Sequence, residues 1–329
     1  MKNLSIARRI FLVGAAIALA GAAAAQGSPQ AFPSKPIRLI VAFPPGGSTT
    51  PVARLVGQKL TERMGQPVVI DNRPGANGVI ASEELLRSAP DGHTLLMVVN
   101  THSLNPLTMA TLPYDNNKDF AAVSTLYRFE LVLVGYPKLP AANLAEFVSL
   151  AKAQPDKFTF AVGDSVGQTH LASETFNTMA GTKIQIVPFI GSGPALTSTM
   201  GGHVDVAFAS PAAVISLIKG DKLKAFAISG NSRLPALAEV PTFNEAGLPG
   251  VDVGGWAGLL APAATPKPIV NKLATEIAAV MALPDVKEAL AAMGLQALAI
   301  PSEQFAQLIR SETAKFDKLI KTANIKLVK

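Results

Sequence analysis

The sequence predicts an α/β protein of two lobes, with the second lobe inserted into the first. Its 329 residues exceed the roughly 100–200 that one domain usually takes, and 49% of them are hydrophobic against 16% charged, which favours a folded chain over a disordered one. Short apolar runs of strand length alternate with segments of helical periodicity, a pattern typical of parallel sheets covered by helices.

The first 25 residues have the pattern of a signal peptide. Lys2, Arg8 and Arg9 precede an apolar run over residues 10–20, and Ala23-Ala24-Ala25 has the small side chains that signal peptidase accepts. The run is shorter than the ~20 residues of a membrane-spanning helix, which argues against the alternative of a membrane anchor. We therefore expect export with cleavage near Ala25, by either the Sec or the twin-arginine route.

The next part of the chain predicts a β-α-β-α-β unit, the start of a parallel sheet. We expect Thr50 to cap the first helix with Pro51 at its first position, and Gly65 to end it. The strands of this unit are expected at residues 37–43, 67–71 and 93–100, and its helices at residues 50–64 and 77–88.

The middle and the end of the chain repeat this alternation. Further strands are expected at residues 131–134, 158–162, 184–187, 204–209, 223–229 and 256–260. Further helices are expected at residues 143–153 and 168–180, from about residue 194, and at 266–281, 284–293 and 302–322. The chain is expected to cross between lobes near residues 127 and 250, so that lobe 1 comprises residues 26–127 plus 251–329 and lobe 2 comprises residues 128–250.

A glycine loop between the first strand and the first helix is the strongest local candidate for a binding site. It contains Phe43, Gly46, Gly47, Ser48, Thr49 and Thr50. Backbone N–H groups at a helix start favour an anion, and the two glycines would let a ligand approach the main chain. The loop lacks the Gly-Lys-Ser/Thr of a phosphate-binding loop, and an ordinary tight turn with a helix cap remains the alternative.

A second motif, Gly163-Asp164-Ser165-Val166-Gly167, matches the G-x-S-x-G pattern of a hydrolase nucleophile. That fold requires an acid and then a late histidine after the serine. The last histidine is His203, and the only acid between it and Ser165 is Glu174, on the helix that the motif would start. An exported serine hydrolase is therefore only a remote alternative, and we expect no enzyme activity.

The residue types give no reason to expect a metal, a cofactor or nucleic acid. The chain has no cysteine, and its four histidines lack the spacing of metal ligands. The net charge is only +6, and three of the basic residues lie in the leader. Uncharged polar groups instead follow several strands, at the edge where α/β sheets bind ligands. The candidates at this edge are the polar residues Asn100, Thr101, Ser165, Thr169 and Ser210, the apolar Phe189, and His170 near a helix start.

Over its full length the chain resembles the Bug-type substrate-binding proteins of the tripartite tricarboxylate transporters. The blocks that carry this resemblance include Phe32-Pro33-Ser34-Lys35-Pro36-Ile37-Arg38, Phe43-Pro44-Pro45-Gly46-Gly47-Ser48-Thr49, Asn72-Arg73-Pro74-Gly75-Ala76, Pro90-Asp91-Gly92-His93-Thr94, Gly201-Gly202-His203-Val204-Asp205, Val240-Pro241-Thr242 and Ala261-Pro262-Ala263-Ala264-Thr265-Pro266.

The resemblance implies a type II periplasmic binding fold, whose two α/β lobes close on a ligand in the cleft between them. It implies that the glycine loop, Gly46 to Thr49 here, holds the carboxylate of a small organic acid. It also implies a monomer in the periplasm that delivers its ligand to a permease of two membrane subunits. A sensory partner that presents its ligand to a signalling receptor is the alternative role on the same fold.

Three departures from the family pattern bear on the ligand. Thr50 replaces a common Asp, Asp164-Ser165-Val166-Gly167 replaces Gly-x-Gly-Ser, and Phe189-Ile190 replaces Tyr-Lys. The wall of the second lobe is thereby more apolar. We therefore expect a carboxylate whose far end is apolar or aromatic, rather than a second strongly charged group.

Overall fold

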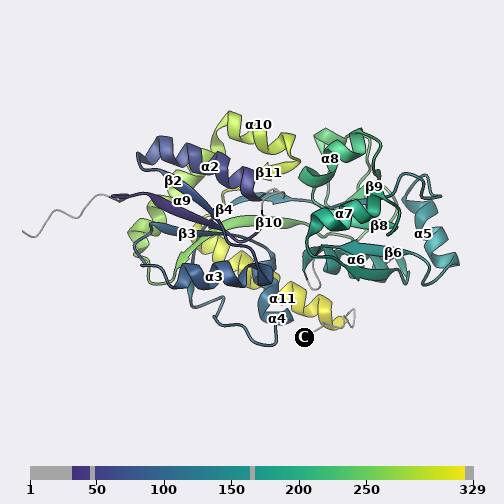
Figure 1. Ribbon diagram of the computed structural model, residues 1–329, viewed down its shortest axis with the longest axis horizontal. Coiled ribbons are helices and arrows are strands. Elements are labelled where there is room, and N and C mark those ends of the chain that lie inside the picture. The colour runs from purple at the N-terminus through teal and green to yellow at the C-terminus, as the bar shows by residue number, and fades with distance from the viewer. Residues whose placement is uncertain (1–31, 45–48, 164–166, 323–329) are drawn as a thin grey trace, which may run out of the picture. The chain divides into compact units, whose positions relative to one another are not determined.

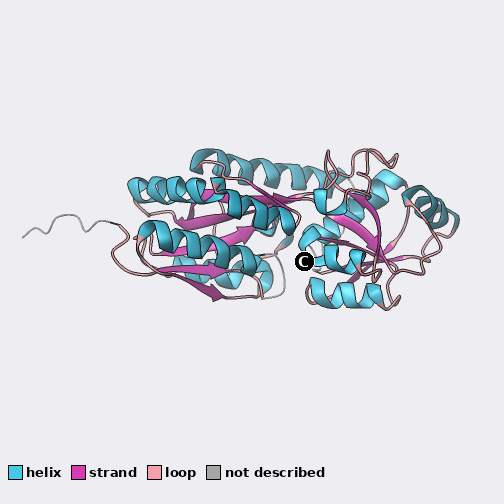
Figure 2. Ribbon diagram, turned by 90° about the horizontal axis from the view of Figure 1, so that it is seen from above, coloured by secondary structure: helices cyan, strands magenta, loops and turns pink. Residues whose placement is uncertain are grey.

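The computed structural model describes residues 32–44, 49–163 and 167–322. The chain divides into two compact units, residues 1–34 and 35–329, and everything below concerns the second. Its strands form two sheets with helices packed beside them (Figures 1 and 2). The predicted glycine-loop residues Gly46, Gly47 and Ser48, the motif serine Ser165 and the leader lie outside the described residues.

The first sheet has six strands in the order β11-β4-β10-β3-β1-β2. The strands β1, β2 and β3 are parallel, as expected, whereas β10 runs antiparallel to both β3 and β4. The bounds of these strands are β1 Ile37–Val41, β2 Val68–Asn72, β3 Thr94–Val99, β4 Phe120–Phe129, β10 Gly255–Pro262 and β11 Leu295–Ala297.

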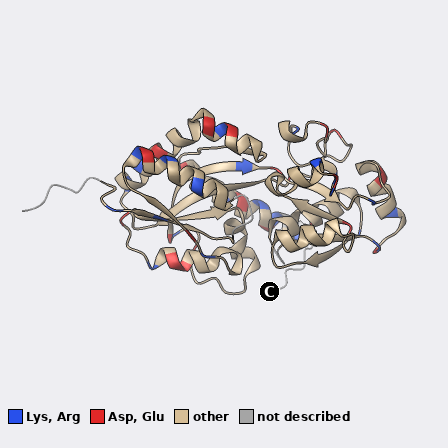
Figure 3. Ribbon diagram, turned by 45° about the horizontal axis from the view of Figure 1, so that its top comes forward, with Lys and Arg blue, Asp and Glu red and all other residues tan. Residues whose placement is uncertain are grey.

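The helices packed with this sheet come from both ends of the described chain. They are α2 Thr49–Met64, η1 Ala76–Gly78, α3 Val79–Leu86, α4 Thr101–Thr108, α9 Lys267–Ala282, α10 Pro284–Ala292 and α11 Ser302–Thr322. Basic and acidic residues alternate along the ribbons of α2 and α10 (Figure 3), and Lys59 of α2 pairs with Asp285 of α10 at 2.6 Å. The ring of Trp256 packs edge-on against Phe305 of α11, with centroids 4.9 Å apart.

The second sheet has five strands in the order β7-β6-β8-β5-β9. The strands β6, β7 and β8 are parallel, and β5 runs antiparallel to β8 and β9. The bounds are β5 Val132–Gly135, β6 Thr159–Val162, β7 Gln185–Pro188, β8 Val206–Ala209 and β9 Lys224–Ile228. Its helices are α5 Leu144–Ala153, α6 Gln168–Ala180, α7 Ser192–Met200, α8 Pro211–Lys219 and η2 Pro235–Leu237.

Local sequence explains how the helices of the second sheet start and stop. The side chain of Asn143 accepts a hydrogen bond from the N–H of Glu146 at 3.0 Å, and Glu146 in turn accepts from the N–H of Ala142 at 2.7 Å. This reciprocal cap satisfies donors that would otherwise be unpaired at the start of α5. Gly181 ends α6 with φ +62°, a conformation that glycine adopts without steric cost.

Most predicted elements are present, with five omissions and one correction. The sequence analysis did not predict β4, α4, α8, η2 or β11. The predicted start of the first helix is wrong. Helix α2 begins at Thr49, so Thr50 lies inside the helix and Pro51 is its third residue rather than its first. The hydroxyl of Thr50 accepts a hydrogen bond from Asn72 instead of capping the helix. All strands of the second sheet lie between residues 132 and 228, inside the span predicted for lobe 2, but the lobe boundaries themselves stay a prediction.

Candidate functional site

The predicted residues of the first sheet lie at its carboxyl edge. Strands β1 and β3 are parallel neighbours, with Val41 beside Met97. Phe43 follows β1 and Asn100 follows β3, so both come to the same edge. The side-chain amide of Asn72, at the end of β2, donates to the carbonyl of Phe43 and to the hydroxyl of Thr50, both at 2.9 Å. This edge is thus fixed by polar contacts before any ligand arrives.

Asn100 is the most unusual residue at this edge. It is fully buried, and its N–H donates to the carbonyl of Trp256 at 3.2 Å. Neither atom of its side-chain amide has a hydrogen-bond partner among the described residues. Buried amides are rarely left without partners, since each unpaired polar group costs about 1–3 kcal/mol. Asn100 therefore holds an unpaired amide at this edge, with an NH2 donor group and a carbonyl acceptor.

The start of α4 adds further donors beside Asn100. Thr101 begins this helix and is buried, and the fully buried hydroxyl of Ser103 likewise has no partner among the described residues. Backbone N–H groups in the first turn of a helix favour an anion. Sequence reasoning missed Ser103 because α4 itself was not predicted.

The predicted residues of the second sheet gather at its carboxyl edge in the same way. Strands β7, β6 and β8 are parallel neighbours. Phe189 directly follows β7, and Ser210 lies between β8 and α8. Thr169 is the second residue of α6, the helix that comes after β6. The N–H of Gly163 donates to the hydroxyl of Thr169 at 3.2 Å. Phe189 is partly buried against the core of this sheet, and Ile190 beside it is 99% exposed. Apolar surface is therefore exposed at Ile190 beside this edge, while the contact of this wall with a ligand stays a prediction.

His170 is placed to interact with its own helix. Its Nε2 atom lies 3.8 Å from a carboxylate oxygen of Glu174, one turn along α6. Its Nδ1 atom is buried and has no partner among the described residues. A role for His170 in ligand binding stays a prediction.

Two contacts bring the edges of the two sheets together. The side-chain nitrogen of Gln168, at the start of α6, lies so close to Gly255 that a Cβ there would come within 2.6 Å of it. Gly255 precedes Trp256, whose carbonyl holds Asn100. On another side, Gly294 approaches Pro211 of α8 so closely that a Cβ would come within 2.3 Å. Gln168 was not among the predicted residues, although it immediately precedes Thr169.

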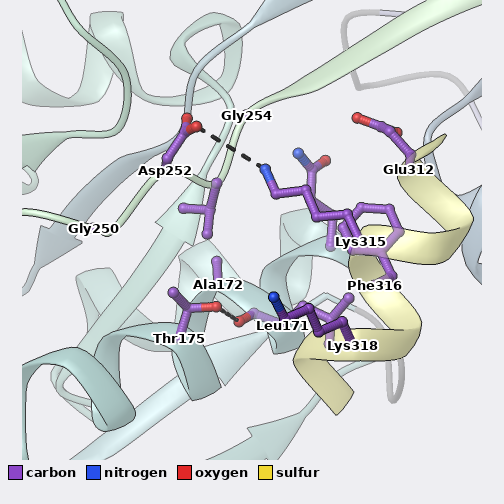
Figure 4. Close-up of a pocket in the computed structure, with 12 residues that line it drawn as sticks. Leu171, Ala172, Thr175, Gly250, Asp252, Gly254, Glu312, Lys315, Phe316 and Lys318 are labelled. Carbon is purple, nitrogen blue, oxygen red and sulfur yellow. Dashed lines mark hydrogen bonds and ion pairs between the residues drawn. The ribbon is translucent and has the colours of Figure 1, made fainter. Parts of the chain in front are cut away.

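A cavity of about 350 Å³ lies next to this junction (Figure 4). None of the predicted site residues lines it. Its walls come from α6, from the segment of residues 250–254 that leads into β10, and from α11. The carboxylate of Glu312 on α11 accepts a hydrogen bond from the indole N–H of Trp256 at 2.6 Å. Burial raises the pKa of Glu312 to about 7, against the opposing effect of that hydrogen bond and of Lys315.

Within the described ranges, the structure contains no cluster of three or more His, Asp or Glu side chains that could hold a metal. His102 on α4 is buried between Tyr114 and Phe120, which lowers its pKa to about 4, so the ring is neutral at physiological pH. The described residues also include no helix that is long and apolar enough to cross a membrane.

Comparison with known sequences gives matches over most of the chain. Residues 52–325 match the family described as the tripartite tricarboxylate transporter family receptor. The chain is 35% identical to a UPF0065 protein from the tcbD-tcbE intergenic region of Pseudomonas sp. strain P51, over 96% of this chain and 94% of that protein. It is 34% identical to protein BugT of Bordetella pertussis, over 98% of this chain and all of that protein.

Solved structures give the same result. An R. palustris protein solved with adipate matches with a TM-score of 0.84 and 31% identity, over 89% of this chain and 98% of that one. MatC from Rhodopseudomonas palustris, solved with malate, matches with a TM-score of 0.78 and 33% identity, over 88% of this chain and all of that one. The periplasmic binding protein BugD matches with a TM-score of 0.81 and 27% identity, over 90% of this chain and 99% of that one. These likenesses confirm the predicted fold class, that of a periplasmic binding protein with two α/β lobes.

Proposed function

Because the chain belongs to the tripartite tricarboxylate transporter receptor family, we propose that it is a periplasmic solute receptor for a small organic carboxylate. The ligand binds between lobe 1, residues 26–127 plus 251–329, and lobe 2, residues 128–250. The loaded receptor delivers its ligand to a membrane permease of two subunits. The leader of residues 1–25 directs export and is removed.

The buried amide of Asn100 is the observation that carries this proposal. Its unpaired donor lies beside the first turn of α4, where Ser103 adds a hydroxyl and the helix N-terminus adds a favourable field. A carboxylate is rich in acceptors and carries the charge that such a turn favours. Hydrogen bonds of this kind in a buried place are worth about 1.5–3 kcal/mol each.

The edge of the second sheet selects the rest of the ligand. Thr169 and Ser210 supply hydroxyls there, whereas Phe189 and the exposed Ile190 supply apolar surface. A ligand that contacts both edges stabilises the closed arrangement of the lobes, and one that contacts a single edge does not shift this balance. The R. palustris relative was solved with adipate, which shares the first carboxylate and the apolar middle expected here but ends in a second carboxylate, so we expect the ligand of this chain to differ from adipate at its far end.

A thermal-shift screen of the purified protein tests this function. The panel contains aliphatic mono-, di- and tricarboxylates, aromatic carboxylates and acidic amino acids. A ligand present at about 100 times its dissociation constant stabilises the folded state by about 2.7 kcal/mol, which gives an easily measured shift. We expect a shift with one class of carboxylate that has an apolar body. No shift with any carboxylate, from a protein shown to be folded, would contradict the proposal, and tight binding of citrate would contradict the apolar far end.

A further inference from the structure

The cavity beside α11 has walls from three separate segments of the chain. Gln168, Leu171, Ala172 and Thr175 lie on one face of α6, at the spacing of successive helical turns. Figure 4 shows the side chains of Glu312, Lys315, Phe316 and Lys318 opposite them, on α11. The segment of residues 250–254 closes the third side. At about 350 Å³ the cavity falls within the ~300–1,000 Å³ typical of small-molecule sites.

The floor of this cavity is apolar. Leu171 and Phe316 pack with Leu104 in a small buried cluster, and Ala172 and Val253 extend the apolar surface. The hydroxyl of Thr175 is already engaged, because it donates to the carbonyl of Leu171 at 2.7 Å. The floor therefore suits a hydrocarbon or aromatic group of a ligand.

The polar groups around this floor include one donor left unpaired by the described part of the chain and two ammonium groups. The side-chain nitrogen of Gln168 is buried and has no partner among the described residues. Lys315 and Lys318 add two ammonium groups. One carboxylate oxygen of Glu312 already accepts from the indole of Trp256, and Asp252 forms a loose ion pair of 4.0 Å with Lys315, which leaves Lys318 and the nitrogen of Gln168 to bind an acceptor. An acceptor-rich, negatively charged group would complete this set.

We propose that the cavity is a second binding site, separate from the crevice of Asn100, and that it takes a carboxylate with an apolar body. The carboxylate lies among Lys315, Lys318 and the amide of Gln168, and the apolar body lies on Leu171 and Phe316. The proposal stands independently of the crevice, because the two sites share none of the residues assigned to them.

Binding in this cavity has a signature in its pH dependence. The charged or titratable groups that face Glu312 are Lys315 and Lys318 on its own helix and Asp252 on the crossing segment, while α6 contributes only neutral side chains to the cavity. A bound anion near Glu312 disfavours its ionised form and raises its pKa further. Binding is therefore accompanied by proton uptake and is several-fold tighter at pH 6 than at pH 8. Glu312→Gln, which keeps an acceptor for Trp256, removes this dependence.

Three ligands of one shape test the charge requirement. They are 4-phenylbutyrate, 4-phenylbutan-1-ol and 4-phenylbutylamine, titrated into the purified protein and followed by tryptophan fluorescence. Trp256 is the single tryptophan of the chain, and its indole contacts a residue of the cavity wall. We expect binding of the anion, at least about tenfold weaker binding of the alcohol, and no binding of the amine.

Two sets of variants locate the bound anion. The double variant Lys315→Glu and Lys318→Glu reverses two charges on α11 and should weaken 4-phenylbutyrate at least tenfold. Arg310→Glu, at an exposed position of the same helix outside the cavity, is the matched control and should leave binding unchanged. Asn100→Ala should weaken the crevice ligand found in the thermal-shift screen but leave unchanged the binding of 4-phenylbutyrate that depends on the two lysines.

Each result decides between the two sites. The inference is overturned if 4-phenylbutyrate does not bind, if the alcohol or the amine binds as well as the anion, or if Asn100→Ala removes 4-phenylbutyrate binding while the lysine variant keeps it. A different outcome is that no carboxylate binds in the crevice while 4-phenylbutyrate binds in a way that depends on the two lysines. That outcome would contradict the proposed receptor function and leave the second site standing.

Discussion

Replacing Asn100 by Ala should weaken ligand binding without strongly destabilising the ligand-free protein. Asn100 has φ −59° and ψ −10°, ordinary helical values that alanine adopts without strain. Although it precedes the first residue of α4, its side chain makes no capping hydrogen bond that alanine would remove. The substitution thus removes only an amide that has no partner among the described residues.

The expected changes in affinity and in stability follow from the typical free energy of a hydrogen bond and from the burial of Asn100. One lost hydrogen bond to a carboxylate costs about 1.5–3 kcal/mol, which corresponds to roughly 10- to 150-fold weaker binding. The ligand-free protein loses a buried polar group that costs free energy when unpaired, and it gains a small cavity that costs free energy in turn. We therefore expect its free energy of unfolding to change by less than about 1 kcal/mol.

Two measurements on the same samples test this prediction. Calorimetric titration with the ligand from the thermal-shift screen gives the affinity, and urea unfolding without ligand gives the stability. Asn116→Ala is the matched control, because the buried amide of Asn116 donates to the carbonyl of His102. This control should lower the free energy of unfolding by about 1–2 kcal/mol and change the affinity little. A strongly destabilised Asn100→Ala with unchanged affinity would refute the reasoning.

Three further predictions concern titration and packing. The pKa of Glu312 is about 7 in the folded protein and near 4.5 in the unfolded chain, so the folded state keeps its proton to higher pH. The free energy of unfolding should therefore fall by on the order of 3 kcal/mol as pH rises from about 4.5 to 7. Glu312→Gln should flatten this part of a plot of urea midpoint against pH. The pKa of His102, lowered to about 4, has the opposite consequence, because the unfolded chain takes up the proton at higher pH than the folded protein does. The free energy of unfolding should therefore fall as pH drops from about 6.5 to 4, and His102→Leu should abolish this loss in the same plots. Gly294→Val places a Cβ against Pro211 at a residue with φ +69°, a backbone conformation that valine rarely adopts. We expect a lower melting temperature and weaker ligand binding. An unchanged melting temperature and affinity would show that the backbone at this contact moves aside without cost.

The local sequence pattern was sufficient for helices whose ends are marked by capping residues or glycine. Helix α6 has the predicted bounds, with Gly181 after its last residue, and α5 has the predicted cap at Asn143. Helix α4 was missed because it contains Pro106 and few apolar residues; it is held by packing on α11, where the hydroxyl of Thr313 donates to the carbonyl of Ser103 at 3.0 Å.

Strand β4 and its partner β11 show what single-sequence reasoning cannot supply. Strand β4 lies between β10 and β11, and both partners come from more than 120 residues further along the chain. The hydroxyl of Thr125 in β4 donates to the carbonyl of Leu298, and Ser124 donates to the carbonyl of Ile300. Such pairing is set by tertiary contacts, which leave no local periodicity to detect.

For the candidate site too, some residues could be predicted from the local sequence and others could not. The positions of Asn100, Thr169 and Ser210 at the carboxyl edges of the two sheets could be predicted, because residues that follow parallel strands come to such an edge; their contact with a ligand stays a prediction. Gln168 and Glu312 could not, because their significance lies in contacts with Gly255 and Trp256 on a distant strand.

The central claim, that this receptor recognises a carboxylate, is tested most directly by comparing one ligand with its methyl ester. Isothermal titration of the purified protein would use the carboxylate with the largest thermal shift and the ester of the same acid, at equal ionic strength. The ester keeps the shape and the apolar body but loses the charge. We predict that the acid binds at least about tenfold more tightly than the ester, because charged hydrogen bonds to Asn100 and the first turn of α4 are lost. Equal affinities for the acid and the ester would contradict the account.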